Sequence, residues 1–299
     1  MNATPSFRNA PAIDGPGLLR SEQSAKPFLR WAGSKRKQLS RLKPFLKETH
    51  TGYVEPFAGS ACLFFAAAPK VAVLGDSNKE LIEVYRAVRD DPDHLYDRLV
   101  RIKRDLRTYN RWRSYDPRQL DQRTRAVRLL YLNRNCFNGI YRTNTDGHFN
   151  VPMGTKPGRY FSRAELKQCS ALLRRAKLVA GDFTKTIEHV KSGNLVYLDP
   201  PYAVNSRRIF REYGKQVFDT SDMERFGESL DEITNRKADF IVSYADCREA
   251  RLLARQWNAI RVPTRRHIAG FAGARRSAYE WIITNLSIRK TLEADAWRN

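Results

Sequence analysis

The chain has 299 residues, 41% of them hydrophobic, which is enough to bury the core of one large domain or two modest ones. Lysine and arginine total 54 against 32 acidic residues, so the formal net charge is +22. Such a field favours a polyanionic partner, with nucleic acid ahead of an anionic membrane; a basic surface without a partner is the plain alternative. We expect no membrane segment, because no apolar run approaches the roughly 20 residues of a spanning helix.

Cysteine and histidine usage gives no sign of a metal site or a disulfide framework. The four cysteines are scattered without a Cys-x-x-Cys pair, and the five histidines are equally dispersed. The N-terminal residues lack the basic start and apolar stretch of a secretory signal. We therefore expect a cytoplasmic protein that binds no metal.

The first part of the chain predicts a leader followed by an α/β sheet. Residues 1–25 are rich in Asn, Ala, Pro, Gly and Ser without periodicity, which is typical of a disordered leader. Apolar residues at helical spacing predict a helix over 39–46. Two strand–turn–helix units follow, over 53–67 and 71–88, and consecutive units of this kind predict a parallel sheet. Asp76 ends the second strand, with Ser77 or Asn78 as helix N-cap.

Residues 92–178 have a different character and predict an inserted domain. Arginine-rich amphipathic helices come first, and the stretch "CFNGIYRTNTDGHFNVPMG" follows them. Its Asn138-Gly139 and Asp146-Gly147 pairs are typical of turns, so we expect a β-hairpin here. The sheet domain would then comprise residues 26–91 and 179–299.

Strand patterns resume after the insert. "KLVAGDF" and "NLVYLDPPY" each end in an acid, Asp182 and Asp199, and "ADFIVSYAD" is a further strand. The last two, "NAIRVPTRRHI" and "AYEWIITNL", have no helix between them and predict an antiparallel pair at one sheet edge. Ligands of parallel α/β sheets bind at the carboxyl ends of the strands, where these acids would gather.

The turn after the first strand indicates the kind of ligand. Ala58-Gly59-Ser60 lacks both the dinucleotide pattern GxGxxG and the GK[ST] of a phosphate-binding loop. The acid at the second strand end, Asp76, suits the hydroxyl pair of a ribose. Together these features favour a nucleoside without a phosphate.

The sequence Asp199-Pro200-Pro201-Tyr202 predicts a rigid corner where a strand ends, because proline cannot donate to a sheet ladder. Asp199 and the Pro200 carbonyl could accept hydrogen bonds from an amino group, and Tyr202 offers a face for stacking on a planar ring. Acceptors of this kind can orient an amino group without first removing a proton from it.

Four blocks in this order, "FLRWAGSKRKQL", "EPFAGSA", "NRNCFNGIYRTNTDGHFNVPMG" and "DPPY", resemble the Dam-type (D12 class) DNA adenine-N6 methyltransferases. The resemblance begins near Lys26 and covers nearly all of the remaining chain. It implies an α/β fold: a Rossmann-like, S-adenosylmethionine-dependent methyltransferase sheet with an inserted, mostly helical DNA-recognition domain. The implied enzyme is bacterial or phage-encoded and methylates an adenine flipped out of duplex DNA, at a site that could resemble GATC. We expect a monomer without an obligate protein partner.

The resemblance also implies residue roles. The residues that match cofactor contacts are Trp31, Lys35, Pro56, Phe57, Gly59, Asp76 and Asp199. We expect the strand-end acid Asp182 to belong to the same cofactor site. The catalytic corner is Asp199, Pro200 and Tyr202. The DNA contacts are Phe137, which fills the gap left by the flipped base, Asn138, and the base-reading positions Ile140, Arg142 and Pro152. Ser34 and Ser60 depart from the pattern, since glycine is commoner at both positions.

Plainer interpretations exist for single residues and for the whole chain. Trp31 could be a core aromatic, Asp76 a helix cap, and Phe137 a residue packed beneath the hairpin. An RNA or cytosine amino-methyltransferase would share the cofactor pocket, and a DNA-binding protein without catalysis would share the basic insert. The presence of both Asp199 and Tyr202 favours a DNA adenine methyltransferase.

Overall fold

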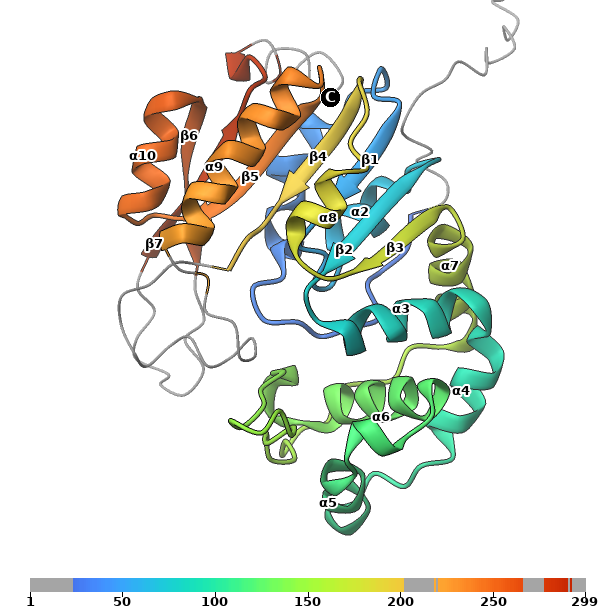
Figure 1. Cartoon of the computed structure of the whole chain (residues 1–299). Coiled ribbons are helices and arrows are strands. Elements are labelled where there is room, and N and C mark those ends of the chain that lie inside the picture. Colours follow the sequence, from blue (N-terminus) through green and yellow to red (C-terminus); the bar gives the residue numbers. More distant parts are fainter. Residues whose placement is uncertain (1–23, 202–217, 219, 266–276, 290, 292–299) are drawn as a thin grey trace, which may run out of the picture.

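A computed structural model describes residues 24–201, 218, 220–265, 277–289 and 291 (Figure 1). In this part of the chain seven strands form one sheet in the order β3-β2-β1-β4-β5-β7-β6. The strands are β1 (Gly52–Glu55), β2 (Ala72–Asp76), β3 (Ala176–Ala180), β4 (Asn194–Leu198), β5 (Asp239–Ala245), β6 (Asn258–Arg265) and β7 (Ser277–Thr284). Strands β1 to β5 pair in parallel, and β7 runs antiparallel to β5 and β6. The expected parallel sheet with an antiparallel edge pair is confirmed.

Alternation along the central strands builds an apolar layer on each face of the sheet, because successive strand side chains point to opposite faces. Tyr53 and Tyr197 lie in the layer that α2 (Cys62–Ala67), α3 (Lys79–Asp90) and α7 (Arg163–Leu173) cover. Val54 and Val196 lie in the other, which α8 (Phe183–Ile187), α9 (Thr220–Asn235) and α10 (Arg248–Gln256) cover. The result is a three-layer sandwich.

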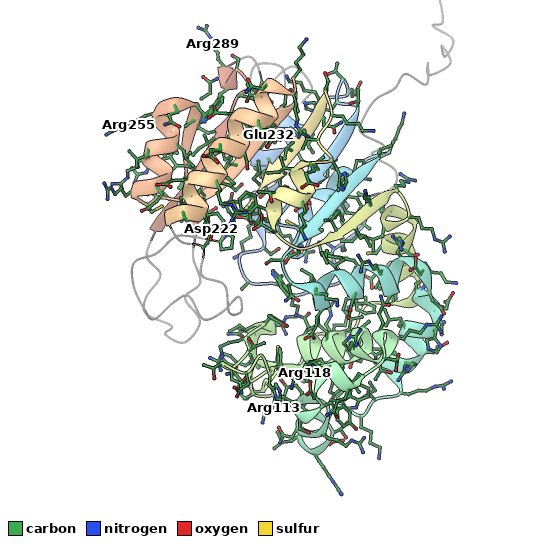
Figure 2. The ribbon with its side chains drawn as sticks, in the orientation of Figure 1. Arg113, Arg118, Asp222, Glu232, Arg255 and Arg289 are labelled. Carbon is green, nitrogen blue, oxygen red and sulfur yellow. The ribbon has the colours of Figure 1, made fainter. Side chains whose placement is uncertain are left out.

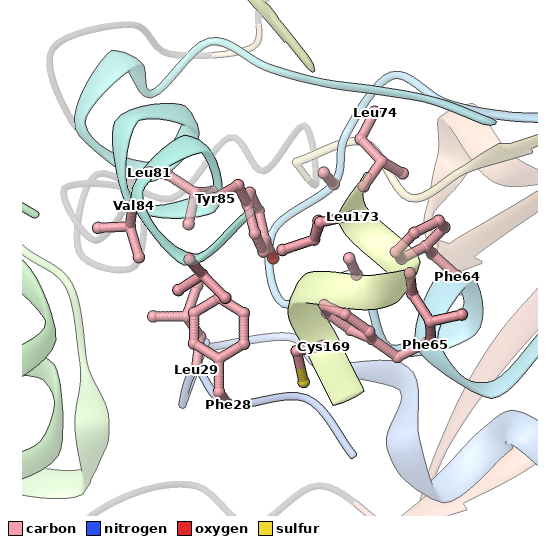
Figure 3. Packing of buried hydrophobic residues seen from close by; sticks show 14 of the residues in the cluster. Phe28, Leu29, Phe64, Phe65, Leu74, Leu81, Val84, Tyr85, Cys169 and Leu173 are labelled. Carbon is pink, nitrogen blue, oxygen red and sulfur yellow. The ribbon is translucent and has the colours of Figure 1, made fainter. Parts of the chain in front are cut away.

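The first layer also anchors the N-terminal segment of the described chain. Phe28 packs edge-on against Phe65 of α2 and Tyr85 of α3, with centroid distances of 6.0 and 5.6 Å (Figure 3). Ala25, which the sequence assigned to the leader, is buried, and its amide donates to the carbonyl of Phe65. Ser24 is described too, and residues 1–23 of the expected leader lie outside the described residues.

The helix expected over 39–46 is wrong as a single element. The structure has three short pieces: the 3₁₀ turns Lys35–Gln38 and Lys43–Phe45 flank a single α-helical turn, α1 (Leu39–Leu42). Pro44 explains the break, since it lacks the amide hydrogen that a continuing helix needs.

Helices α4 (Pro92–Val100), α5 (Leu106–Ser114) and α6 (Gln122–Asn135) group beneath α3, away from the sheet (Figure 1). Aspartates cap all three: Asp91, Asp105 and Asp121 each accept a hydrogen bond from a backbone amide in the first helical turn. A 3₁₀ turn, Pro117–Gln119, joins α5 to α6.

Residues 136–154, which we call the 136–154 loop, follow α6. Its two arms meet at isolated antiparallel bridges, Cys136 with Met153 and Thr143 with Phe149, and Asn144 donates to the carbonyl of His148 near the tip. The chain therefore reverses as expected, but no ladder of strands forms, so a regular β-hairpin is not confirmed.

Helix α7 and strand β3 both pack with the sheet domain. A complete capping box, Ser162 with Glu165, starts α7, which packs against α3, and β3 begins at Ala176. We therefore propose that the insert ends near residue 162 rather than at 178.

None of the helices in the described ranges is long and apolar enough to cross a membrane. Within the same ranges, His, Cys, Asp and Glu side chains form no group of three or more that could hold a metal ion.

Candidate active site

A cavity of about 410 Å³ lies at the carboxyl ends of β1, β2 and β4. Its volume falls within the range of small-molecule sites. The lining includes every residue that the sequence assigned to cofactor binding, namely Trp31, Lys35, Pro56, Phe57, Gly59, Asp76, Asp182 and Asp199. Pro200 lines it as well, whereas Tyr202 lies outside the described residues. The strand-end acids Asp76 and Asp199 meet here because the parallel strands bring their carboxyl ends to one edge.

Asp199, the first residue of the proline corner, forms an ion pair with Lys35. Asp199 follows β4, and Lys35 begins the first 3₁₀ turn; the Lys35 ammonium lies 2.5 Å from Oδ1 of Asp199. The two side chains are only 4% and 20% exposed. Burial raises the pKa of Asp199, and the charge and hydrogen bond of Lys35 oppose that rise. Lys35 therefore favours the ionised form of a carboxylate that burial disfavours.

The proline corner is tied to the next strand of the sheet. The hydroxyl of Tyr244, on β5, donates to the carbonyl oxygen of Pro201 at 3.3 Å. This contact supports a stretch in which two consecutive prolines already restrict the backbone.

Asp76 joins the turn after β1 to the start of α3. One carboxylate oxygen accepts from the amide of Gly59 at 2.9 Å, and the other accepts from the amide of Asn78 at 2.8 Å. Asn78, not Asp76, caps α3 by accepting from Leu81. Burial raises the pKa of Asp76 to about 6, although the two amide hydrogen bonds lower it.

Gly59 allows the Trp31 ring to pack closely against the turn after β1. Its φ of +46° lies in the left-handed region, and a Cβ there would be 3.0 Å from Cδ1 of Trp31. Its carbonyl accepts from the hydroxyl of Tyr85 at 2.6 Å. Close packing of Trp31 on this turn therefore requires glycine.

Asp182 caps α8 and also lines the cavity. It accepts from the Thr184 amide at the start of α8 and from Nη2 of Arg225 at 2.6 Å. Burial acts to raise the pKa of Asp182, but these hydrogen bonds and the Arg225 charge lower it overall. Arg225 also binds Asp222, which lies at the end of α9 nearest the helical part of the chain (Figure 2).

The sequence analysis did not find Arg225 and Asp222, although both line the cavity. They lie on α9, at no strand end and in no quoted motif, so no local signal points to them. The remaining lining includes Phe57, whose ring stacks on Phe183 at 5.3 Å, and the buried Glu55, which accepts from the Tyr53 hydroxyl at 2.8 Å.

The two serines that depart from the family pattern meet at the cavity. Ser60 donates to Oγ of Ser34 at 3.1 Å, and both line the cavity. The pair ties the loop before Lys35 to the turn after β1.

The five residues assigned to DNA all lie on the 136–154 loop. Phe137 is 42% exposed, and its amide donates to the carbonyl of Pro152. Asn138 is exposed and takes a φ of +53°. Nε of Arg142 donates to Asn150 at 2.8 Å, while Ile140 packs against the core. The hydroxyl of Tyr109 on α5 supports the loop by donating to the carbonyl of Val151.

Figure 2 shows a further helical residue, Arg113 on α5, in the part of the chain that carries this loop. Its guanidinium lies 3.4 Å from the carbonyl oxygen of Val151. The loop is therefore held between α5 and the end of α6.

The mixed seven-stranded sheet, with an acid-lined cavity at its carboxyl edge, is consistent with a methyltransferase fold. Residues 31–268 match the family described as "D12 class N6 adenine-specific DNA methyltransferase", and the chain belongs to this family.

Three similar proteins have methyltransferase or methylase names. The chain is 30% identical over 280 residues to the type II methyltransferase M1.LlaDCHI of Lactococcus lactis subsp. cremoris, covering 90% of this chain and 98% of that protein. It is 31% identical over 241 residues to the type II methyltransferase M.MjaIII of Methanocaldococcus jannaschii, covering 73% and 83%. It is 29% identical over 268 residues to the DNA adenine methylase of Escherichia coli K12, covering 85% and 93%.

Proposed function

We propose that this enzyme transfers a methyl group from S-adenosylmethionine to the N6 amino nitrogen of an adenine flipped out of duplex DNA. The observation that carries the proposal is the Asp199 carboxylate, which lines the cavity, pairs with Lys35 at 2.5 Å and adjoins the proline corner. Such an acceptor suits an amino group, and its ionised form is the better acceptor.

The cavity fits S-adenosylmethionine in size and in the chemistry of its donors and acceptors. Asp76 offers carboxylate oxygens that would accept from the ribose hydroxyls, and Gly59 lets the Trp31 ring pack closely against the turn after β1. The stacked rings of Phe57 and Phe183 offer an apolar surface for the nucleoside, with Asp182 beside them. When bound, the cofactor would supply an electrophilic methyl group on a sulfonium.

The residues of the chain would orient the target base. Asp199 would accept a hydrogen bond from the adenine amino group and direct the nitrogen lone pair into the cavity, so no proton need be removed before attack. Formation of the nitrogen–carbon bond would break the bond between sulfur and the methyl carbon and leave S-adenosylhomocysteine. The methylated nitrogen would then release one proton to become neutral. The Pro200 carbonyl would accept the second amino hydrogen. A paired and stacked adenine cannot reach this position, so the base must leave the duplex, and Phe137 would fill the gap.

The 136–154 loop would supply the sequence readout. Arg142 can hydrogen-bond to a guanine edge in the major groove, and Ile140 and Pro152 offer apolar contacts to bases. A GATC-like target is compatible with these residues. The helices α4–α6 and this loop would form the DNA-recognition domain, and the excess positive charge would bind phosphates.

The test is product analysis. Purified protein is incubated with methyl-labelled S-adenosylmethionine and mixed-sequence duplex DNA, and the DNA is digested to nucleosides for mass spectrometry. Label in N6-methyldeoxyadenosine is the expected result. Label on cytosine, or bound DNA without label, would contradict the proposal.

A further inference from the structure

Tyr141 joins the 136–154 loop to the wall of the cavity. Its ring stacks on Trp31 with a centroid distance of 5.3 Å and an interplanar angle of 24°. Trp31 lines the cavity, whereas Tyr141 does not. Burial raises the pKa of the Tyr141 hydroxyl, and a hydrogen bond with the Asn78 side chain partly offsets that rise. Asn78 lines the cavity as well, so Tyr141 contacts two cavity residues from outside.

The backbone before Trp31 is fixed to the same part of the chain. The Arg30 amide donates to Oδ1 of Asn133 at 2.9 Å, and Nδ2 of Asn133 donates back to the Arg30 carbonyl. Gly139 packs closely on Arg30, because a Cβ at Gly139 would lie 2.5 Å from the Arg30 Cβ. Trp31 is therefore positioned by α6 through its backbone and by the loop through its ring.

The loop side of this contact is the segment assigned to DNA. Tyr141 lies between Ile140 and Arg142 in sequence. Its ring also packs edge-on against the ring of Phe149, on the opposite arm of the loop, with a centroid distance of 5.9 Å. A shift of Ile140 or Arg142 against a base would move Tyr141, which stacks on Trp31. Trp31 in turn packs directly on Gly59, in the turn after β1. A continuous chain of packed groups thus leads from the base-reading residues to the cofactor site.

We propose that Tyr141 is a positioning residue that holds Trp31 against Gly59 and thereby links DNA binding to cofactor binding. The inference rests on the proposed function. Linkage is reciprocal, so each ligand must raise the affinity for the other by the same factor. Phenylalanine at this position retains the stack, whereas leucine retains apolar bulk against Phe149 but removes the planar contact with Trp31.

The test measures the dissociation constant of S-adenosylhomocysteine by calorimetry, with and without saturating duplex DNA. In the wild type we expect DNA to tighten binding by a factor of about 5 or more, as is usual for coupled sites. Tyr141→Leu should weaken the binding of S-adenosylhomocysteine in the absence of DNA, and the ratio of its dissociation constants without and with DNA should fall close to one. Tyr141→Phe should keep both the affinity and the ratio near their wild-type values. In turnover, the leucine variant should raise KM for S-adenosylmethionine and leave kcat nearly unchanged.

The chain offers a matched control. Tyr115 packs edge-on against Trp112 at 5.6 Å, in a second Trp–Tyr pair away from the cavity. Tyr115→Leu should change neither the product affinity nor the DNA effect. Equal effects of the two leucine variants, or wild-type coupling in Tyr141→Leu, would overturn the role of Tyr141. A wild type that binds neither S-adenosylhomocysteine nor DNA would overturn the proposed function with it.

Discussion

The Lys35 ammonium lies 2.5 Å from the Asp199 carboxylate, although 164 positions separate the two residues in sequence. Both side chains are largely buried, and burial raises the pKa of Asp199. The charge of Glu280, on β7, raises it further, so Lys35 is the cation that opposes both effects. A buried carboxylate that must accept a hydrogen bond from a neutral amino group depends on such a partner to remain ionised.

The first prediction concerns the pH dependence of turnover. In Lys35→Met the pKa of Asp199 should rise, because the opposite charge that favours the ionised carboxylate is lost. The acidic limb of kcat, measured at saturating S-adenosylmethionine, should therefore move to higher pH. Lys35→Arg keeps the charge and should keep the limb near its wild-type position. An unmoved limb in Lys35→Met would show that Lys35 does not set the ionisation of Asp199.

The second prediction concerns Asp76, whose pKa is about 6. If its carboxylate accepts from the cofactor ribose, affinity for S-adenosylhomocysteine should fall several-fold between pH 7.5 and 5.5. Unfolding does not explain such a fall. The folded pKa lies above the unfolded value of about 3.9, so the Asp76 contribution to stability is fully present below about pH 4 and is lost as pH rises through about 6.

Calorimetry at the two pH values checks the Asp76 prediction. Asp182 is the contrasting acid, because its pKa is lowered and it stays ionised over this range. Asp182→Asn should therefore weaken binding by a similar factor at both pH values and leave the pH effect in place. A wild-type affinity that stays flat between pH 7.5 and 5.5 would refute the role given to Asp76.

The third prediction concerns base flipping. Phe137 is 42% exposed, so Phe137→Ala should leave thermal stability nearly unchanged. Without the ring to fill the gap, the flipped state should be less populated, and single-turnover methylation should slow by roughly tenfold, since unstacking costs a few kcal/mol. The fluorescence of 2-aminopurine at the mapped target adenine measures the flipped population directly. Leu106→Ala removes another exposed apolar side chain, on α5, and should have no effect on either readout.

The fourth prediction separates base reading from phosphate binding. Arg142→Ala should reduce discrimination between the target and single-base variants by about 1–3 kcal/mol, which is the value of one bidentate base contact. Arg111→Ala removes an exposed side chain on α5. It should instead weaken binding to all DNA sequences alike and reduce the slope of log binding constant against log salt concentration by about one. Methylation rates on a panel of duplexes, with binding at several salt concentrations, distinguish the two. Equal loss on every duplex in Arg142→Ala would remove it from the base-reading set.

Much of the fold could be predicted from local patterns. The strand–turn–helix patterns around β1 and β2 predicted a parallel sheet, and the lack of a helical sequence pattern between the last two strand patterns predicted the antiparallel edge pair, both of which are confirmed. Parallel strands carry their carboxyl ends to one edge, so Asp76 at the end of β2 and Asp199 after β4 could be placed in one site before any contact was known.

Contacts between distant segments could not be predicted in this way. No spacing rule relates Lys35 to Asp199, or Trp31 to Tyr141, because each pair forms only after the sheet and the helices pack. Arg225 was missed for the same reason. The regular hairpin was expected from turn residues at Asn138-Gly139 and Asp146-Gly147, yet turn chemistry specifies a reversal and not the length of the ladder beside it.

The most direct test of the account is single-turnover methyl transfer by Asp199→Ala, with the affinity for S-adenosylhomocysteine measured on the same preparation. We expect transfer to fall by about 10²–10³-fold or more, as for the loss of a preorganised hydrogen-bond partner, while the product still binds. Asp90→Ala removes an exposed carboxylate at the end of α3 and should leave both values unchanged. An Asp199→Ala enzyme that methylates adenine at the wild-type rate would contradict the account.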